Sequence, residues 1–215
     1  MAGRQTRGVG TREAVLNAAL EVFTEKGYAA AGIEDIRARS GASVGSIYHH
    51  FGAKEQIAAA LYARGLEDYR DGLLAALARS RGAEAGIRAI VRHHLRWVTS
   101  EPALAGFLMN RRETEVVAAS QERVHALNRE TFARIAEWQA EHVSSGSLNE
   151  LPLDLLLAIA LGPAQEFARH LLAGRATTSL ARAERTLAAA AWAALRAQSR
   201  PVPSAAARRS SGAAR

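Results

Sequence analysis

The sequence predicts an all-α fold, and three observations support this. Of the 215 residues, 48% are hydrophobic but only 6% are aromatic, a composition that suits packed helices lined with alanine and leucine. Strong helix formers dominate beyond the N-terminal region. No stretch sustains the alternation of apolar and polar residues that is typical of a strand. We therefore expect about nine helices, arranged around one or two cores.

The N-terminal region contains three predicted helices, at 11–27, 33–40 and 44–50. Gly41 follows the second helix and can adopt the left-handed conformation that ends a helix at no steric cost. Ser43 is a good N-cap for the third helix, because its hydroxyl can accept a hydrogen bond from a free backbone N–H group. Two helices joined by a short turn that contains a glycine form a helix-turn-helix motif, whose second helix enters the major groove of DNA.

The third predicted helix has two different sides. Ile47 and Phe51 are four residues apart and can bury together on one side. The other side presents hydroxyls, a phenol and imidazoles but no carboxylate, which suits phosphates and base edges. These outward residues are Ser46, Tyr48, His49 and His50. The segment therefore predicts a helix that binds DNA.

A longer pattern surrounds this helix. It runs through Phe-x-x-x-Gly at the end of the first helix, then the helix-turn-helix, then Tyr-x-x-Phe-x-x-Lys. The residues that fit it are Phe23, Gly27, Tyr28, Ile36, Gly41, Ser43, Gly45, Tyr48, Phe51, Lys54 and Glu55. On these residues the segment from Thr11 to about Leu61 resembles the N-terminal domain of the TetR (tetracycline-repressor-like) transcriptional regulators.

Three positions depart from that pattern. Gly32 stands where the family usually has Thr or Ser as the cap of the second helix, and glycine caps only slightly less well. Arg37 and Ser40 replace two small apolar residues, so the side chain of Arg37 must extend past the helix contact that it borders. These departures concern local packing, so the resemblance stands.

The resemblance assigns DNA contacts to individual residues. We expect a valine methyl to meet a thymine methyl, a serine hydroxyl to bond a base edge, and a glycine to let the backbone approach closely. The expected base-contacting residues are Val44, Gly45, Ser46 and Tyr48. The expected phosphate-contacting residues are Ser43, Tyr48, His49, His50 and Lys54.

The net charge of +7 is concentrated at the two ends of the chain. Residues 1–12 carry three arginines and residues 200–215 carry four, with no acid in either segment, and the remaining 21 Lys and Arg equal the 21 Asp and Glu. The high charge is therefore no proof of a basic DNA-binding face. Residues 1–10 read as a flexible basic arm, which either reaches phosphates or the minor groove or is merely solvated. Residues 200–215, rich in Pro, Ser, Ala and Arg, are expected to form a disordered basic tail.

Six further helices are expected after the DNA-binding domain at 11–55. The first of them is long and links that domain to a helical body at 56–199. Pro102 separates two of the helices, because the residue before a proline is pushed out of the helical region. The predicted ranges are 53–80, 84–100, 102–110, 113–144, 151–173 and 178–198.

The last two helices are expected to join two copies of the chain. They are apolar over more than one stripe, which a monomer of this size would struggle to cover. The resemblance implies that they pair with their two-fold mates as a four-helix bundle, so the operator is expected to be an inverted repeat with half-sites about 34–36 Å apart. The alternative is that these stripes are internal core. The expected interface residues are Leu156, Ala160, Phe167, Leu187, Trp192 and Leu195.

The body is also expected to hold an effector. Two predicted helices carry polar groups on inward stripes, and ligand pockets combine apolar walls with a few polar anchors. The resemblance implies a cavity between the fifth to eighth helices, whereas each residue taken singly is more simply explained as core. The candidate pocket residues are His94, Trp97, Phe107, Asn128, Thr131, Phe132, Trp138 and Phe167.

Several other functions find no support in the sequence. The chain has no cysteine, hence no disulfide framework and no thiolate metal site, and neither His93-His94 nor Glu166-x-x-x-His170 has further ligands at a recognisable spacing. There is no nucleophile elbow or phosphate loop, so no enzyme, metal or cofactor is expected beyond an unknown small-molecule effector. We see no signal peptide or membrane-spanning run and expect a soluble, cytoplasmic protein without membrane contacts.

The sequence thus predicts a homodimeric repressor that binds double-stranded DNA and is released by its effector. Two alternatives remain open. The chain could activate transcription with the same fold, or it could be a helical protein-binding module or enzyme that carries this domain.

Overall fold

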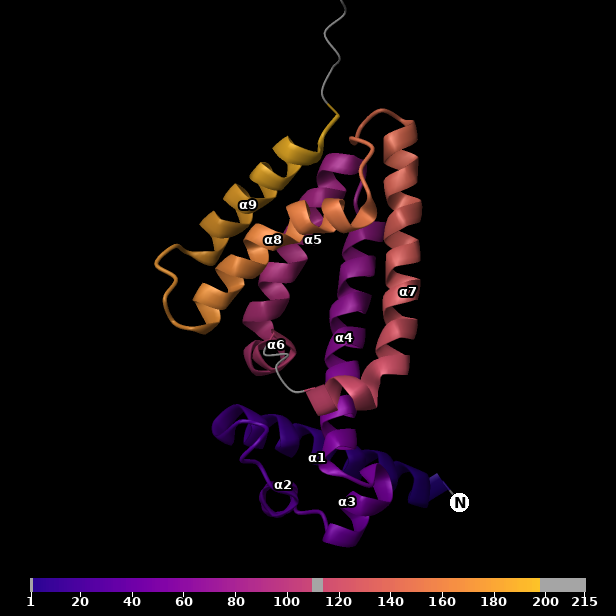
Figure 1. Ribbon diagram of the computed structural model, residues 1–215, viewed down its shortest axis with the longest axis vertical. Coiled ribbons are helices and arrows are strands. Elements are labelled where there is room, and N and C mark those ends of the chain that lie inside the picture. The colour runs from indigo at the N-terminus through magenta and orange to yellow at the C-terminus, as the bar shows by residue number, and fades with distance from the viewer. Residues whose placement is uncertain (1, 110–113, 198–215) are drawn as a thin grey trace, which may run out of the picture.

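The computed structural model describes the backbone of residues 2–109 and 114–197 and the side chains of 10–109 and 122–197. The described residues form helices joined by short loops, with one isolated β-bridge between Leu148 and Arg196 (Figure 1). The helices are α1 (Ala2–Lys26), α2 (Ile33–Ser40), α3 (Val44–Phe51), α4 (Lys54–Ala78), α5 (Ala83–Ser100), α6 (Pro102–Met109), α7 (Thr114–Ser144), α8 (Leu153–Leu172) and α9 (Leu180–Leu195). The all-α prediction is confirmed for this part of the chain.

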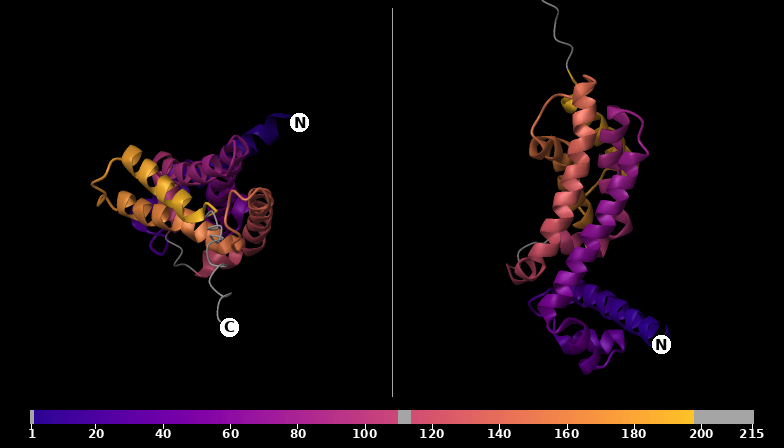
Figure 2. Two further views of the ribbon diagram at one scale, coloured as in Figure 1. Left: turned by 90° about the horizontal axis from the view of Figure 1, so that it is seen from above. Right: turned by 90° about the vertical axis from the view of Figure 1, so that its right-hand side faces the viewer.

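The helices form two units that share α4. The N-terminal unit, α1–α3, lies at one end of an elongated molecule, and α4 rises from it into the body, α4–α9 (Figure 1). Helix α7 runs beside α4, while α5, α8 and α9 pack together on the opposite side of α4 (Figure 2). Helix α6 lies low in the body, where it contacts α1.

Each unit has its own apolar core. The core of the N-terminal unit continues along the first turns of α4 and up to α6, and the core of the body is built by α4, α5, α8 and α9 with one turn of α7. Completely buried residues of the first core include Val15, Leu16, Ala19, Ile36, Ile57 and Leu61. Those of the second are Ile87, Ile90, Val91, Leu95, Leu156 and Ala164. Burial of these side chains stabilises the fold by roughly 1.5–3 kcal/mol for each large apolar residue.

An ion pair between two body helices adds to this packing. Arg96 of α5 donates to both carboxylate oxygens of Glu184 of α9, at 2.8 and 2.9 Å. Glu184 is nearly buried, and its carboxylate raises the pKa of Arg96. This bidentate salt bridge helps to fix the orientation of α9 relative to α5.

The observed helices from α2 onward differ from the predicted ranges by no more than three residues at either end. The first helix differs more, because it begins at Ala2 and includes residues 2–10, which were expected as an arm before the helix. Buried Val15 and Leu16 anchor the helix, and no proline between Ala2 and Thr11 ends it. The predicted tail at 200–215 lies outside the described residues.

Candidate nucleic-acid interface

The turn between α2 and α3 has the geometry expected of a helix-turn-helix. Gly41 ends α2 in the left-handed region, with φ at 68°, and its N–H donates to Arg37 O at 3.1 Å. Ser43 then caps α3, because its Oγ accepts from the N–H of Ser46 at 3.1 Å. Both caps predicted from the sequence are confirmed, so residue chemistry alone positions the start of α3.

The two sides of α3 differ sharply in exposure. Ile47 and Phe51 are buried against the core, at 1% and 8% exposure. One turn apart on the other side, Val44 is 40% exposed and Tyr48 is 49% exposed. Only four large apolar side chains of the described residues are this exposed, and two of them are on this short helix. This exposed pair makes the outward side of α3 the candidate binding surface of the helix-turn-helix.

The remaining predicted contact residues surround this pair. Gly45 and His49 are exposed, while Ser46 and His50 are half-exposed. A Cβ atom built at Gly45 would meet no atom within 4 Å, so its surface is open. The rings of His49 and His50 are 5.5 Å apart at the C-terminal end of α3. The structure thus brings together Val44, Gly45, Ser46, Tyr48, His49 and His50 on and around the outward side of α3.

Ion pairs hold α2, and through it α3, against α1. Arg39 donates to Glu25 at 2.7 Å and to Glu21 at 3.0 Å, and this guanidinium holds the pKa of Glu25 below its usual value. Asp35 accepts from Lys26 at 2.8 Å and from the N–H of Gly32 at 3.0 Å. The second contact satisfies a free backbone donor at the start of α2 although Gly32 has no side chain to cap it.

Lys54 has a structural role that the sequence did not reveal. Its Nζ donates to the carbonyl oxygens of Tyr28 and Ala31, at 3.0 and 3.1 Å, and lies 4.4 Å from the centre of the Tyr28 ring. These contacts tie the first turn of α4 to the loop between α1 and α2. Two of the three ammonium protons are therefore used inside the protein, and the predicted phosphate contact stays a prediction.

A polar cluster lies between α4 and α5, in which His94 and Trp97 are buried, Tyr69 is partly buried and Asp68 is exposed. The Tyr69 hydroxyl and His94 Nδ1 are 3.1 Å apart, and the Trp97 indole N–H donates to Asp68 at 2.7 Å. Tyr69 also contacts the Trp97 ring, with the centroids 5.2 Å apart. Burial raises the pKa of Tyr69 and lowers that of His94 to about 4, so both groups are neutral near pH 7.

His94 leaves one ring nitrogen without a partner. Its side chain is 7% exposed, and Nε2 is a buried polar atom with no hydrogen bond among the described residues. If Tyr69 donates to Nδ1, the hydrogen of His94 is on Nε2 and one donor remains unmet. The reverse arrangement would leave both the phenol hydrogen and Nε2 unmet, so the first is favoured. A buried unmet donor costs roughly 1–3 kcal/mol, so His94 Nε2 is the candidate group in this cluster for bonding an acceptor.

The other predicted pocket residues do not gather around His94. Phe107 stacks on Phe23 of α1, and Phe132 is 44% exposed on α7. Trp138 packs so closely on α5 that a Cβ at Gly86 would lie 2.3 Å from its ring. Phe107 therefore contacts the N-terminal unit and Phe132 lies at the surface of a single chain, and their assignment to an effector pocket stays a prediction.

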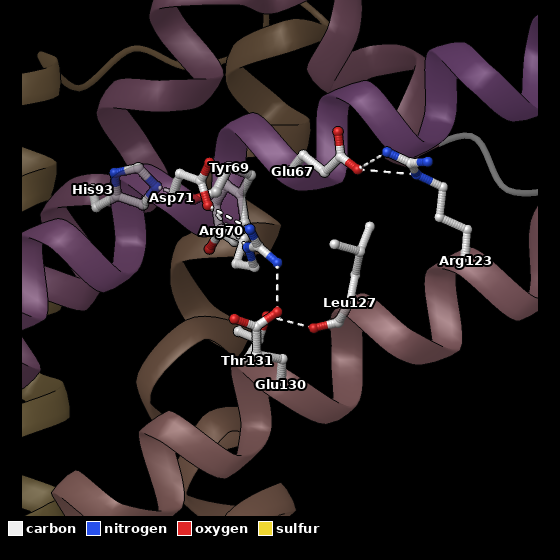
Figure 3. Close-up of polar contacts among 9 residues, drawn as sticks. All are labelled: Glu67, Tyr69, Arg70, Asp71, His93, Arg123, Leu127, Glu130 and Thr131. Atoms are coloured by element: carbon white, nitrogen blue, oxygen red, sulfur yellow. Dashed lines mark hydrogen bonds and ion pairs between the residues drawn. The ribbon is translucent and has the colours of Figure 1, made fainter.

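Three further predicted pocket residues are only partly buried. Thr131 donates to Leu127 O of its own helix at 2.7 Å, a bond that leaves its acceptor capacity free (Figure 3). Asn128 is half-buried, and Phe167 packs against the body core. Sequence reasoning also missed Tyr69 and Asp68, the α4 partners of His94 and Trp97. No signal in a single sequence pairs residues of two helices that meet only after folding.

The predicted dimer-interface residues divide into two groups. Leu156, Ala160 and Leu195 are at most 2% exposed within one chain, so they are core residues and their assignment to an interface is corrected. They point toward α5 because the apolar stripes of α8 and α9 are wide and one part of each must cover the body core. Phe167, Leu187 and Trp192 are partly exposed. The outward side of the two helices instead carries Leu155, Ala158, Gly162, Pro163, Ala189, Ala190 and Ala193.

Two other features are absent from the described residues. They contain no group of three His, Cys, Asp or Glu side chains that could hold a metal ion. None of their helices combines the length and the apolar character that crossing a membrane requires.

Comparisons with known proteins support the family resemblance. Residues 15–61 match the model of bacterial regulatory proteins, tetR family. Over 48 residues the chain is 46% identical to the HTH-type transcriptional repressor Rv3405c of Mycobacterium tuberculosis. This alignment covers 22% of the chain and 26% of the repressor, so the chain matches about a quarter of that relative.

Solved structures extend the likeness to the whole fold. A TetR family transcription regulator from Marinobacter aquaeolei has a TM-score of 0.70 at 19% identity, covering 90% of this chain and 100% of that one. The regulator FadR from Bacillus subtilis, in complex with stearoyl-CoA, has a TM-score of 0.70 at 17% identity, covering 83% and 96%. At these identities the structures share the fold. Residues 15–61 thus match the tetR family of bacterial regulatory proteins, and the chain as a whole shares the fold of solved TetR family regulators.

Proposed function

We propose that this protein is a cytoplasmic, homodimeric transcriptional repressor, not an enzyme, that binds an inverted-repeat operator and is released by a small-molecule effector. The single observation that carries the proposal is the outward side of α3. Val44 and Tyr48 are exposed there on a helix whose opposite side is buried in the core. A short, capped helix of this kind fits the major groove.

The residues on and around α3 then divide by role. Val44, Gly45, Ser46 and Tyr48 meet base edges, with the Val44 methyl groups against a thymine methyl group. Ser43, Tyr48, His49, His50 and Lys54 meet phosphates and set the position of the helix along the groove. Ser43 combines this role with capping, since its hydroxyl accepts from Ser46 N and still has a hydrogen to donate.

Two copies are needed to read two half-sites, and the outward side of α8 and α9 supports an association of two chains. Leu155 is 48% exposed there, and its neighbours on the same side of α8 are small or apolar. Small side chains let helices approach closely, and a two-fold axis matches the symmetry of an inverted repeat. The proposed interface therefore includes Leu155, Ala158, Gly162 and Ala189, flanked by Phe167, Leu187 and Trp192.

The effector site is proposed at the buried cluster of Tyr69, His94 and Trp97. The unmet N–H of His94 selects an effector that presents a neutral or anionic acceptor, such as a carbonyl oxygen, in an otherwise apolar site. FadR from Bacillus subtilis, which shares this fold, was solved in complex with stearoyl-CoA, which supports a small-molecule ligand for this chain as well. Effector binding would favour a spacing of the two N-terminal units that no longer matches successive major grooves.

Selection from random duplex DNA tests the DNA-binding role. The purified protein is expected to enrich an inverted repeat whose half-sites are separated by about one helical turn. The enriched duplex then serves as the operator in fluorescence-anisotropy titrations. Absence of any enrichment at low salt would contradict the proposal and favour a protein-binding module or an enzyme.

A thermal-shift screen of metabolites and drugs tests the effector site. Compounds that stabilise the protein are retested on His94→Leu, which removes the N–H but keeps an apolar side chain. A compound that binds at the proposed site should stabilise His94→Leu much less than the wild type. It should stabilise the control variant His125→Leu, which changes an exposed histidine of α7, as much as the wild type. Equal stabilisation of all three proteins would place the effector elsewhere.

A further inference from the structure

A hollow of about 330 Å³ opens where α1, α4 and α7 meet, at the joint between the N-terminal unit and the body. Small side chains of α4 form its bottom, and each of the three helices contributes one arginine to its walls. The bottom consists of Ala59, Ala60 and Ala63, of which Ala59 and Ala63 are nearly buried. The arginines are Arg12, Arg64 and Arg123. The hollow is separate from the His94 cluster, whose residues are not among those that line it.

The three guanidinium groups share two carboxylates. Glu13 accepts from Arg64 at 3.2 Å and from Arg12 at 3.5 Å. Glu67 accepts from Arg123 Nε at 3.0 Å, in a contact that spans α4 and α7 (Figure 3). The side chains of these pairs are between 28% and 67% exposed, so each pair holds loosely and can rearrange.

The arginines keep hydrogen-bond donors to spare. A guanidinium has five N–H donors, and the bonds of Arg64 to Glu13 and to Asn17 all leave from Nη1. Arg123 uses Nε and Nη2 on a single oxygen of Glu67. The hollow therefore combines an excess of cationic donors at its sides with an apolar bottom.

We propose that this hollow binds a small organic anion, with its carboxylate or phosphate on the arginines and a short apolar group on the alanines. Guanidinium groups match both anions with two parallel hydrogen bonds. The volume lies near the lower end of that of ligand pockets, roughly 300–1,000 Å³, which suits a molecule about the size of a substituted benzene ring.

Arg12 connects this site to the DNA-binding helix. Its guanidinium carbon lies 5.4 Å from the centre of the ring of Phe51, the last residue of α3. An anion that draws Arg12 into the hollow weakens this cation–π contact and links α1 more firmly to α4 and α7. Anion binding therefore changes DNA affinity, a consequence that rests on the proposed function, whereas the anion site itself does not.

Isothermal titration calorimetry with benzoate, phenyl phosphate and uncharged benzamide tests the site. We expect saturable binding of at least one of the two anions and none of benzamide. Ala60→Leu fills the hollow and leaves its charges intact, and Arg123→Gln removes one exposed cation. Each change should weaken anion binding by about tenfold or more, while Arg92→Gln, an exposed arginine of α5 outside the hollow, should leave it unchanged.

Three results of the titrations with the wild type and the two hollow variants would overturn the proposal. These are no binding of either anion, equal binding of benzamide, and wild-type anion affinity in both Ala60→Leu and Arg123→Gln. Loss of anion binding in His94→Leu with retention in Ala60→Leu would likewise overturn it, because the anion would then occupy the body. Circular dichroism of each variant shows whether its helices are intact.

The consequence for DNA has its own readout. Anion affinity is measured with and without the operator duplex, and linkage requires the same factor to appear in DNA affinity with and without the anion. If calorimetry shows anion binding but DNA affinity is the same with and without the anion, the site is retained and its regulatory role is removed. Failure to bind any DNA would contradict the proposed function, but the anion titration without DNA would still test the anion site.

Discussion

Phe107 of α6 stacks on Phe23 of α1, with the ring centroids 5.8 Å apart and the ring planes inclined by 12°. This is a direct aromatic contact between the body and the N-terminal unit. Leu104, on the same helix, is buried in the same core as Phe23. The position of α6 is therefore tied to that of α1, which carries α2 and α3.

Phe107→Leu should lower the free energy of unfolding by about 1 kcal/mol, because the aromatic pair is lost while most apolar area is kept. Phe132→Leu is the matched control, since Phe132 is 44% exposed, and its effect should stay within about 0.5 kcal/mol. Urea unfolding measures both. Equal effects would show that the Phe23–Phe107 pair adds nothing beyond ordinary surface burial.

Gly45→Ala should separate folding from DNA binding. Because a Cβ at Gly45 meets no atom of the protein, and alanine favours the helix by up to about 1 kcal/mol, the free protein should be as stable or more stable. On DNA, the added methyl group would occupy the space between the helix backbone and the bases, and operator affinity should fall by about tenfold, or roughly 1.4 kcal/mol.

Gly106→Ala in α6 is the control for Gly45→Ala, since it also adds a methyl group in open space but far from α3. Anisotropy titrations and thermal unfolding of both variants give the comparison. Unchanged operator affinity in Gly45→Ala would remove this residue from the DNA interface.

Lys54→Met and Tyr48→Phe should differ in stability although both weaken DNA binding. Lys54→Met removes the bonds to the Tyr28 and Ala31 carbonyl oxygens, which lowers stability by about 1–3 kcal/mol. Tyr48 is 49% exposed, so loss of its hydroxyl should change stability by less than about 0.5 kcal/mol. Both should weaken operator and nonspecific DNA alike, as phosphate contacts do.

Urea unfolding and anisotropy at several salt concentrations measure these effects. Loss of the Lys54 charge at a phosphate should also reduce the salt dependence of DNA binding by about one unit of slope. A Lys54→Met protein with unchanged slope would have lost a structural contact only.

Leu155→Glu should convert the proposed dimer into a folded monomer, because two carboxylates would be buried near the two-fold axis. Leu155 is 48% exposed in a single chain, so the fold itself should tolerate the change. Phe132→Glu on α7 is the matched control and should remain dimeric. Sedimentation velocity gives the masses, and dissociation of the control alone would place the interface on α7.

His94 should make the protein less stable in acid. Burial lowers the pKa of His94 from 6.5 to about 4. At a pH between these values His94 is therefore protonated in the unfolded chain and neutral in the folded chain. The free energy of unfolding should fall by about 3 kcal/mol as the pH drops from about 6.5 to about 4. His93, whose pKa burial also lowers, acts in the same direction.

The difference between wild type and His94→Leu isolates this effect, because His93 and the carboxylates titrate in both proteins. Urea unfolding at a series of pH values should show the two stability curves diverging with rising pH above about 4 and running parallel above about 6.5. Parallel curves throughout would mean that the pKa of His94 is the same in the folded and the unfolded protein, as expected for a solvated imidazole.

The helix-turn-helix was predictable because its signals are local. Gly41 ends α2 and Ser43 caps α3 through hydrogen bonds to residues within four positions. The spacing of four between Ile47 and Phe51, with polar residues between them, shows which side of α3 is buried. The start of α1 was not predictable in the same way, since residues 2–10 hold three glycines and no proline, signals that disagree about whether a helix continues.

The body shows the limit of reading stripes from sequence. The apolar stripes of α8 and α9 are correctly predicted, but they do not tell which part covers α5 and which faces outward. Leu156, Ala160 and Leu195 proved to be core, and Leu155 lies on the surface one residue away from Leu156. Phe107 and Phe132 were assigned to a pocket because an aromatic residue on a mixed stripe suits a pocket wall and a helix contact equally well.

The sequence by itself determined the helices from α2 onward, the caps of the helix-turn-helix and the resemblance to the tetR family, because each depends on residues close together in the chain or on a fixed spacing of side chains. Only the tertiary structure decided that Lys54 binds the α1–α2 loop, that Tyr69 meets His94, and that three arginines from three helices line one hollow. The residues brought together in this way are 23 to 111 positions apart in the chain. They depend on how whole helices pack, which is the sum of many weak contacts and is set by no single pair of residues.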